Sequence, residues 1–358
     1  MMPFLFNQIF QGQPSIAAGL DIGTHSSKMV VLKKTAGRLE LLHWSIEPID
    51  QGDEKASVKS LLKKVSINPF PCRTALFGRG TLLRVVETTR MSASELKKSF
   101  AFEADRYFPF PAKDVFMDCA IIDNKRKDNK MTVLIAVAKK ELVNERLKLL
   151  KEIGLTADHI GLNAIALANA LAWAGPSVAS SVGHTVIGNQ AVAASLVPSV
   201  AILDIGEMES NLTIHINSVP RFSRDFYIGG RELTRCITNV KSVSLEAAEK
   251  LKAQGGPEIL AILESSDSPL YDILTELRLS FDYFTTEHKV QPAKLLITGG
   301  ASGIPGIVGL MTKHLDLNVE QFNPFAKIKP HRSLDQKDWE GHLGELAVAL
   351  GLALSHFQ

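Results

Sequence analysis

Two short motifs of aspartate and glycine are the residues of this sequence best suited to chemistry. Asp21 and Gly23 end an apolar stretch, and a second apolar stretch starts at Lys28. The same Asp-Ile-Gly sequence returns at Asp204 and Gly206. Glycine allows close backbone approach, and successive N–H groups in such a turn can bind an anion. Two such turns facing each other would hold the phosphates of one nucleotide from both sides.

A short polar turn follows each Asp-Ile-Gly and completes the predicted phosphate site. The predicted residues are Gly23, Thr24 and Ser26 in the first motif, and Gly206, Ser210 and Asn211 in the second. Asp21 and Asp204 can hold a metal ion through its water ligands, because Mg²⁺ between phosphates normally keeps several waters. We therefore expect a nucleotide and Mg²⁺ in one site.

Three further elements are predicted to hold the adenosine. Their residues are the glycine pair Gly229 and Gly230, the charged pair Glu249 and Lys252, and the run Gly299, Gly300 and Ala301. The charged pair is three residues apart, so on a helix it shares one face and could bracket a ribose hydroxyl and an adenine edge. A solvated ion pair has the same spacing, and a glycine pair is also typical of the turn before a helix.

The elements that must position these motifs follow one plan twice. In the first half, strands are predicted at 16–21, 27–33, 38–46, 73–78 and 81–87, with helices at 54–66 and 162–173. In the second half, strands are predicted at 200–204, 211–216, 219–225, 294–298 and 317–320, with helices at 230–240, 245–254, 257–264, 268–288 and 305–314. An Ala-, Leu- and Gly-rich helix at 343–355 suits close packing. The repetition predicts two similar domains with a cleft between them.

A small unit of its own is predicted at 91–156. Ser92 and Glu95 have the spacing of a capping box and open a helix that extends to about Tyr107. Prolines then stop this helix, since proline cannot continue it. Two strands at 115–122 and 131–138 and a helix at 139–153 follow, and Gly154 is placed to end the last helix.

Composition indicates an ordinary folded protein. The 358 residues are 45% hydrophobic and 22% charged, which is enough for two domains with full cores. A net charge of +2 gives no reason to expect nucleic-acid binding. The cysteines, Cys72, Cys119 and Cys236, lack metal-ligand spacing and indicate free thiols in a reducing compartment. The ten histidines show no zinc-ligand spacing either.

Two segments bear on targeting. Residues 1–14 lack the basic region and cleavage site of a signal peptide, so we expect a flexible N-terminus. Residues 160–203 carry no Asp, Glu, Lys or Arg, but Asn163, Gly175 and Pro176 interrupt the apolar run. We therefore expect a buried helix followed by a flexible loop at 176–199, rather than a membrane span.

In this order, the motifs resemble those of the actin-like ATPase superfamily. Asp21, Gly23 and Lys28 match its Asp-x-Gly-x-x-x-x-Lys pattern. The resemblance implies a two-lobed, actin-like (ribonuclease H-like) α/β fold with ATP and Mg²⁺ in the cleft. It also implies that Lys28 contacts phosphate oxygens and that Asp21 and Asp204 lie near the metal. The implied domains are lobe 1 at 15–90 with 157–175 and 330–358, a small subdomain at 91–156, and lobe 2 at 200–329.

Two further segments resemble the PilM family of type IV pilus assembly proteins. Residues 103–111 match its Glu-Ala-x-x-Tyr-x-Pro-Phe-Pro signature, and 276–283 are similar to a family helix. The resemblance implies a cytoplasmic scaffold at the inner membrane that binds the N-terminal peptide of PilN. It also implies contacts with other pilus assembly proteins and motor ATPases, and a role in twitching motility. Phe108 and Phe110 are candidate partner contacts, with core anchors of the small unit as the alternative.

The chain departs from the superfamily in its second motif. Glu207, Met208 and Glu209 stand where small or hydroxyl residues are usual, and no residue is identified to position an attacking water. ATP binding with at most slow hydrolysis is therefore expected. The alternatives are an active actin-like ATPase or sugar kinase, a filament-forming protein of the FtsA type, and a GspL-like secretion scaffold.

Overall fold

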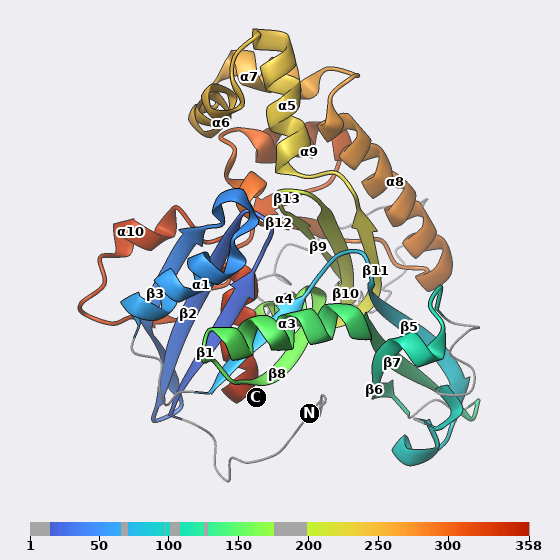
Figure 1. Ribbon diagram of the computed structural model, residues 1–358. Coiled ribbons are helices and arrows are strands. Elements are labelled where there is room, and N and C mark those ends of the chain that lie inside the picture. The colour runs from blue at the N-terminus through green and yellow to red at the C-terminus, as the bar shows by residue number, and fades with distance from the viewer. Residues whose placement is uncertain are drawn as a thin grey trace.

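The part of the chain that the structure describes forms three β-sheets, two of them large (Figure 1). The computed structural model describes residues 15–65, 71–96, 98–100, 108–124, 128–174 and 199–357. The expected flexible start at 1–14, most of the expected loop at 176–199, and residues 101–107 of the family signature lie outside these ranges. No helix in the described ranges is both long enough and apolar enough to cross a membrane.

The two large sheets share one strand order. In the first, β14-β3-β2-β1-β4-β8, the strands are β1 (Ile16–Ile22), β2 (Ser26–Thr35), β3 (Arg38–Pro48), β4 (Cys72–Leu76), β8 (Ala157–Leu162) and β14 (Lys329–Pro330). In the second, β11-β10-β9-β12-β13, they are β9 (Ser199–Ile205), β10 (Ser210–Ile216), β11 (Val219–Phe226), β12 (Lys294–Thr298) and β13 (Val319–Gln321). Apart from β14, each sheet runs third, second, first, fourth and fifth strand. The predicted repetition of one plan is confirmed.

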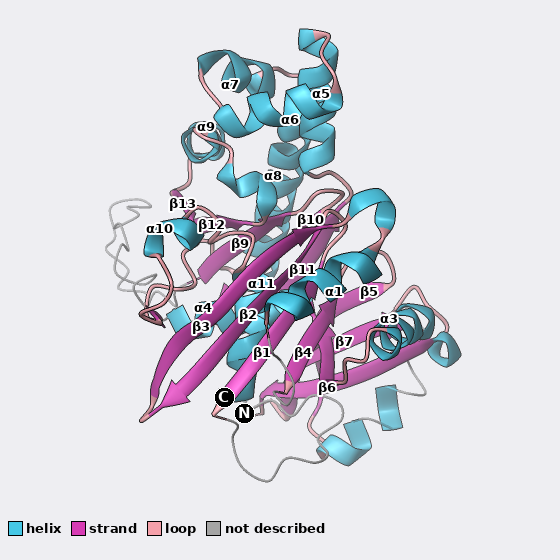
Figure 2. Ribbon diagram, turned by 60° about the vertical axis from the view of Figure 1, so that its left-hand side comes forward, coloured by secondary structure: helices cyan, strands magenta, loops and turns pink. Residues whose placement is uncertain are grey.

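Helices cover both faces of the first sheet, which belongs to lobe 1. They are α1 (Glu54–Lys64), α3 (Lys140–Glu152), α4 (Asn163–Ala174) and α11 (Ala347–Leu354), with a short α10 (Gln336–Glu340) nearby. Side chains alternate along β1: Ala18, Leu20 and Ile22 join the core under α1, whereas Ala17 joins the core under α11. Figure 2 shows α1 lying across the outer face of this sheet.

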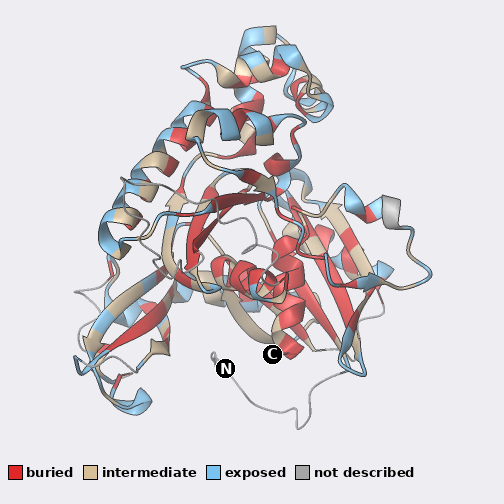
Figure 3. Ribbon diagram, turned by 180° about the vertical axis from the view of Figure 1, so that it is seen from behind, coloured by how far each residue is buried: buried red, intermediate tan, exposed pale blue. Residues whose placement is uncertain are grey.

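The helix predicted at 343–355 is observed as α11 and is packed on all sides. Buried residues concentrate in the large sheets and in the helix next to the C mark of Figure 3. Gly351 lies directly on the backbone of Ala166 in α4, and Gly19 lies on the backbone of α11 at Ala349. A Cβ at either glycine would collide with the facing carbonyl oxygen. The backbone of α11 is therefore in direct contact with the backbones of β1 and α4.

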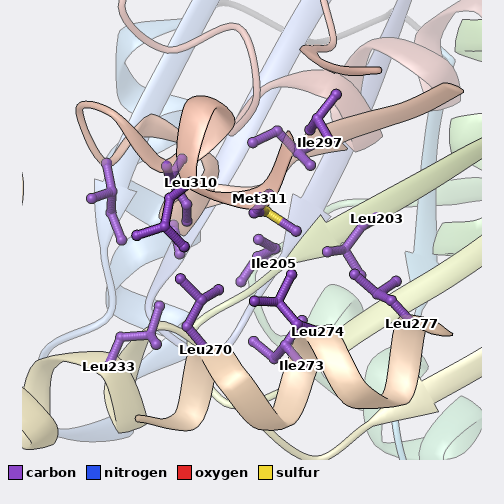
Figure 4. Close-up of a cluster of buried hydrophobic side chains, with 14 of the residues drawn as sticks. Leu203, Ile205, Leu233, Leu270, Ile273, Leu274, Leu277, Ile297, Leu310 and Met311 are labelled. Carbon is purple, nitrogen blue, oxygen red and sulfur yellow. The ribbon is translucent and has the colours of Figure 1, made fainter. Parts of the chain in front are cut away.

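Lobe 2 builds its core between the second sheet and five helices. They are α5 (Gly230–Lys241), α6 (Leu245–Gln254), α7 (Pro257–Glu264), α8 (Pro269–His288) and α9 (Ile307–Leu315). Figure 4 shows Leu270, Ile273, Leu274 and Leu277 of α8 pointing toward Leu203 and Ile205 of β9. The apolar residues of α8 recur at helical spacing, which gives the helix one buried face.

The third sheet differs from the expected small unit in its first strand. Its order is β5-β7-β6, from β5 (Thr81–Thr89), β6 (Val115–Asp123) and β7 (Lys130–Lys139). The strand at 81–89, which was grouped with lobe 1, therefore pairs with β7, and the small sheet begins before the expected boundary at 91. The sheet to which β5 belongs is set by its pairing with the distant strand β7, and the local sequence of β5 does not show this pairing.

Several local predictions agree with the structure, and two strands, β8 and the two-residue β14, were missed. Ser92 and Glu95 form the capping box, with the Ser92 backbone N–H donating to Glu95 Oε2 at 2.8 Å. Gly154 has a φ of +74° after α3, as expected of a helix-ending glycine. The strand β8 was not predicted, since its sequence is short and contains Asp158, His159 and Gly161.

Candidate functional site

The two Asp-Ile-Gly motifs form hairpin turns of the same geometry. The Gly23 N–H donates to the Ser26 carbonyl oxygen at 3.1 Å, and the Gly206 N–H donates to the Glu209 carbonyl oxygen at 3.0 Å. Within the flanking strands, Asp21 pairs with Lys28 in register. The equivalent pair in the second hairpin is Asp204 and Asn211. The two motifs are therefore structural copies whose turns differ in side chains.

Both hairpins line one cavity of about 370 Å³ that lies between the two large sheets. The predicted residues that line it are Asp21, Gly23, Thr24, Ser26, Lys28, Asp204, Gly206, Asn211, Gly230, Glu249, Lys252, Gly299, Gly300 and Ala301. These residues come from distant parts of the chain, and folding brings them around one space. A cavity of this kind is the usual form of a small-molecule site.

Asp21, Asp204 and Lys28 are the charged side chains at the strand ends that lead into and out of the hairpin turns. Lys28 Nζ lies 3.4 Å from Asp21 Oδ2, and both side chains are largely buried. Burial and the nearby Asp21 raise the pKa of Asp204 to about 7, and Lys28 opposes this rise. Two carboxylates with one lysine leave an excess of negative charge, which a divalent cation would compensate.

The donor set is compatible with a water-coordinated metal. Within the described ranges, no group of three or more His, Cys, Asp or Glu side chains is arranged to hold a metal ion directly. Mg²⁺ keeps several waters and is commonly held by one or two carboxylates together with phosphates. Asp21 and Asp204 supply two carboxylates, so the residues present fit Mg²⁺ bound together with a nucleotide.

The charged pair predicted on α6 is built into the opposite end of the cavity. Lys252 is buried, and its Nζ donates to the Gly230 carbonyl oxygen at 3.1 Å, to Thr234 Oγ1 at 2.6 Å and to Glu249 Oε1 at 2.8 Å. Thr234 Oγ1 also donates to Glu249. The pair is thus part of a hydrogen-bond network at the start of α5. Lys252 is buried, so it does not belong to a solvated ion pair.

The glycines after β12 let the chain pass close to the second hairpin. Gly299 has a φ of +85°, and a Cβ there would collide with Asp204 and with the Ile205 carbonyl oxygen. Its N–H donates to the Gly344 carbonyl oxygen at 3.1 Å. Glycine is required at this position both for its φ and for the close approach.

Two predicted nucleotide contacts, Ser210 and Gly229, do not line the cavity, and the two candidate partner contacts lie in the small sheet. Ser210 is 1% exposed and its hydroxyl donates to the carbonyl oxygen of Ile228, just after β11, at 2.7 Å, so the hydroxyl is used within the fold. Gly229 packs on the Glu207 backbone, and its N–H donates to Glu232 Oε2 at 3.1 Å. Phe108 is buried in the core of the small sheet and Phe110 packs against that core, which is the alternative considered for both.

Glu207, Met208 and Glu209, the unusual residues of the second hairpin, each have different neighbours. Glu207 Oε1 lies 3.3 Å from Arg231 Nε, which compensates its charge. Met208 is 38% exposed and lines the cavity. The side chain of Glu209 lies against the backbone of Gly78, and burial, followed by Asp225, raises its pKa to about 7.

Sequence reasoning missed residues that act on the site from distant segments. Arg146 of α3 is buried and donates to the carbonyl oxygens of Ala75 at 3.0 Å and Ile22 at 3.4 Å. It thus supports the strand end that carries Asp21. Asn163, at the start of α4, and Asp225, in β11, line the cavity. No local motif marks these three residues, because only the strand order brings them to the hairpins.

Comparison with known proteins agrees with this architecture. Residues 19–357 match the family model described as type IV pilus assembly protein PilM. The chain is similar to a solved structure, the PilM-PilN type IV pilus biogenesis complex, with 23% identity and a TM-score of 0.79 over 97% of this chain and 100% of that chain. It is also similar to ethanolamine utilization protein EutJ from Carboxydothermus hydrogenoformans, with 12% identity and a TM-score of 0.50 over 98% of this chain and 92% of that chain. The fold is the two-lobed actin-like α/β fold.

Proposed function

The chain belongs to the family of the type IV pilus assembly protein PilM, and from this premise we propose that it is an ATP-binding scaffold of the type IV pilus machine. The observation that carries the proposal is the pair of matching hairpins on one cavity. The first supplies Asp21 and Lys28, and the second supplies Asp204.

The proposed nucleotide extends from the hairpins to α6. Backbone N–H groups of the two turns and Lys28 would bind phosphate oxygens. Asp21 and Asp204 would hold Mg²⁺ through water, and the ion would neutralise phosphate charge. Lys252 and Glu249 would face the ribose, and the backbone at Gly299–Ala301 would face the base.

Binding rather than rapid turnover is the proposed role of this site. Three carboxylates, Asp204, Glu209 and Asp225, line the same cavity as the hairpins. Burial raises the pKa of each of them. With no residue identified to position an attacking water, and with these carboxylates next to the phosphates, the site suits a slow hydrolase at most.

The proposed partner is the cytoplasmic N-terminal peptide of PilN, and the proposed location is the cytoplasmic face of the inner membrane. Support comes from the similarity to the PilM-PilN complex across the whole of that chain. The small sheet offers β6 as an edge strand next to lobe 1. An extended peptide can bind beside such an edge through backbone hydrogen bonds and side-chain pockets.

Calorimetric titration of Mg-ATP into the purified protein tests the proposal. We expect binding by the natural chain and loss of binding in Asp21→Ala, with circular dichroism showing that the variant is folded. A folded natural chain that binds no Mg-ATP would contradict nucleotide binding. Titration of a PilN N-terminal peptide, with and without Mg-ATP, tests the partner separately, and absence of peptide binding in both conditions would contradict that part.

A further inference from the structure

The second hairpin touches the turn that leads into the small sheet. Glu209 is the last residue of the hairpin turn, and its carboxylate lies so close to Gly78 that a Cβ there would collide with it. Gly78 has a φ of +77°, which disfavours any other residue. Both residues line the cavity. A ligand at the hairpins therefore meets a carboxylate that rests on the connection between β4 and β5.

The turn at 77–80 is fixed firmly to the small sheet. The Thr81 N–H and hydroxyl both donate to the Gly78 carbonyl oxygen at 2.9 Å. The Lys139 N–H donates to the Gly80 carbonyl oxygen at 2.8 Å, which ties the end of β7 to the start of β5. A displacement of this turn is therefore transmitted to both strands.

The same turn also reaches lobe 2. The Arg79 guanidinium lies 4.3 Å from the centre of the Tyr227 ring, which is 53% exposed just after β11. Arg79 also carries the charge opposite to that of Glu209. The small sheet is thus attached to lobe 1 by the chain and to lobe 2 by this contact.

A second contact between the small sheet and lobe 2 lies farther along β11. Strands β5 and β11 pack against each other. Arg221 of β11 interacts electrostatically with Asp123 and Glu87 of the small sheet, and these carboxylates partly offset the lowering of its pKa by burial. The small sheet therefore spans the two lobes beside the cavity and must follow any change in their separation.

We propose that Glu209 distinguishes a nucleoside triphosphate from a diphosphate and passes this distinction to the small sheet through Gly78, Arg79 and Tyr227. The inference rests on the proposed nucleotide site. An additional terminal phosphate between the hairpins adds negative charge beside Glu209, Asp204 and Asp225. Above about pH 7 the Glu209 carboxylate is mostly ionised, and repulsion then moves it away from Gly78, so that the turn shifts and the Arg79–Tyr227 contact changes. A diphosphate leaves the carboxylate in place.

Amide hydrogen exchange of the full chain, with Mg-ADP and with Mg-ATP, tests this relay. In the natural chain we expect exchange at 77–83 and at 221–228 to differ between the two nucleotides. Glu209→Gln keeps the size of the side chain and removes its charge. We expect this variant to bind Mg-ATP about tenfold more tightly, since one nearby like charge is gone, and to lose the difference in exchange.

Two more variants separate the steps. In Tyr227→Leu the difference should persist at 77–83 and become smaller at 225–228, because the cation–π contact is absent while the Arg221 contact remains. Glu246→Gln is the matched control, since Glu246 pairs only with the exposed Lys250 on α6 among the contacts described, and it should behave like the natural chain.

The outcomes distinguish the inference from the proposed function. If calorimetry shows that the folded natural chain binds neither nucleotide, the proposed function fails and the inference fails with it. If both nucleotides bind but exchange at 77–83 is the same for each, or if Glu209→Gln retains the full difference, only the inference is overturned.

Discussion

Single residues decide how charge is distributed between the two hairpins. Lys28 stands opposite Asp21 in the first hairpin, whereas Asn211 stands opposite Asp204 in the second. Asn211 donates its Nδ2 to Asp225 Oδ1 at 2.7 Å, so it does not compensate Asp204. Asp204 therefore has no ammonium group opposite it in its own hairpin, whereas Asp21 has Lys28.

The buried Lys252 is expected to stabilise the folded chain. Lys252→Met removes three hydrogen bonds from a buried ammonium group and leaves Glu249 without its charged partner. We expect a loss of about 2 kcal/mol in the free energy of unfolding. Urea unfolding measures it. The control is Lys250→Met two residues earlier, whose side chain is 70% exposed, and it should change stability by at most about 0.5 kcal/mol. Equal effects would mean that the Lys252 network adds nothing.

His215 gives a prediction on pH. Burial lowers its pKa to about 4, so between pH 6.5 and 4 the unfolded chain binds a proton that the folded chain does not. Stability from this residue is present above pH 6.5 and is lost as the pH falls; between pH 7 and 5 we expect a loss of about 2 kcal/mol. His215→Leu should reduce this pH dependence in urea unfolding, whereas the surface variant His331→Gln should not. An unchanged slope in His215→Leu would contradict the assignment.

Some residues of the site could be predicted from the sequence and others could not. Asp21, Gly23 and Asp204 were predictable because strand end, turn and spacing lie in one short segment. Ser210 has the right position in its motif but uses its hydroxyl within the fold. Arg146 lies 124 residues from Ile22, whose carbonyl oxygen it contacts, and nothing local identifies it.

Among the elements, α11 determines how closely lobe 1 packs. It contacts β1 through Gly19 and α4 through Gly351, each at backbone distance. The helix is apolar on every side, which is typical of a helix buried all round. Its small residues at the contact points let three elements approach one another without voids.

Gly351→Ala tests this packing. A Cβ at this position would collide with the Ala166 carbonyl oxygen, so α11 must move away from α4. We expect a loss of about 2–3 kcal/mol in stability, as for overpacked cores. Gly309→Ala in α9 is the control: it has open space for a Cβ and should stabilise by up to about 1 kcal/mol. Thermal unfolding of both variants gives the comparison, and stabilisation by Gly351→Ala would contradict the close contact.

Helices and strands could be predicted where the residues that determine them lie close together in the sequence. The capping box at Ser92 and the glycine after α3 were read correctly, since each signal lies within a few residues. The short strand β8 pairs with β4 at the edge of the first sheet and has no alternating pattern of its own. Assignment of β5 to the small sheet depends on its pairing with β7, and that pairing is a property of the folded chain.

In the whole molecule, the two lobes together form the cavity, and neither lobe forms it alone. Its lining comes from the first hairpin, the second hairpin, the start of α4 and the segment before α11. A ligand there contacts both lobes at once. Binding should therefore stabilise the arrangement of the lobes as well as each hairpin.

Ligand-dependent unfolding follows from this arrangement. With Mg-ATP at a hundred times its Kd, we expect a gain of about 2.7 kcal/mol in the free energy of unfolding, because only the folded chain has the site. Differential scanning fluorimetry with increasing Mg-ATP measures the shift in Tm. Asp21→Ala should show no shift at the same concentrations. An equal shift in both proteins would mean that the nucleotide binds elsewhere.

The position of α11 has a consequence for biosynthesis. Its partners β1 and α4 leave the ribosome long before residues 347–354 are made, and the whole second sheet is translated in between. Lobe 2 can fold during translation, since domains generally fold as units as they emerge. Lobe 1 waits with the Gly19 face of its first strand exposed until α11 arrives. The growing chain is thus most in need of chaperone protection at lobe 1, the part that is synthesised first and completed last.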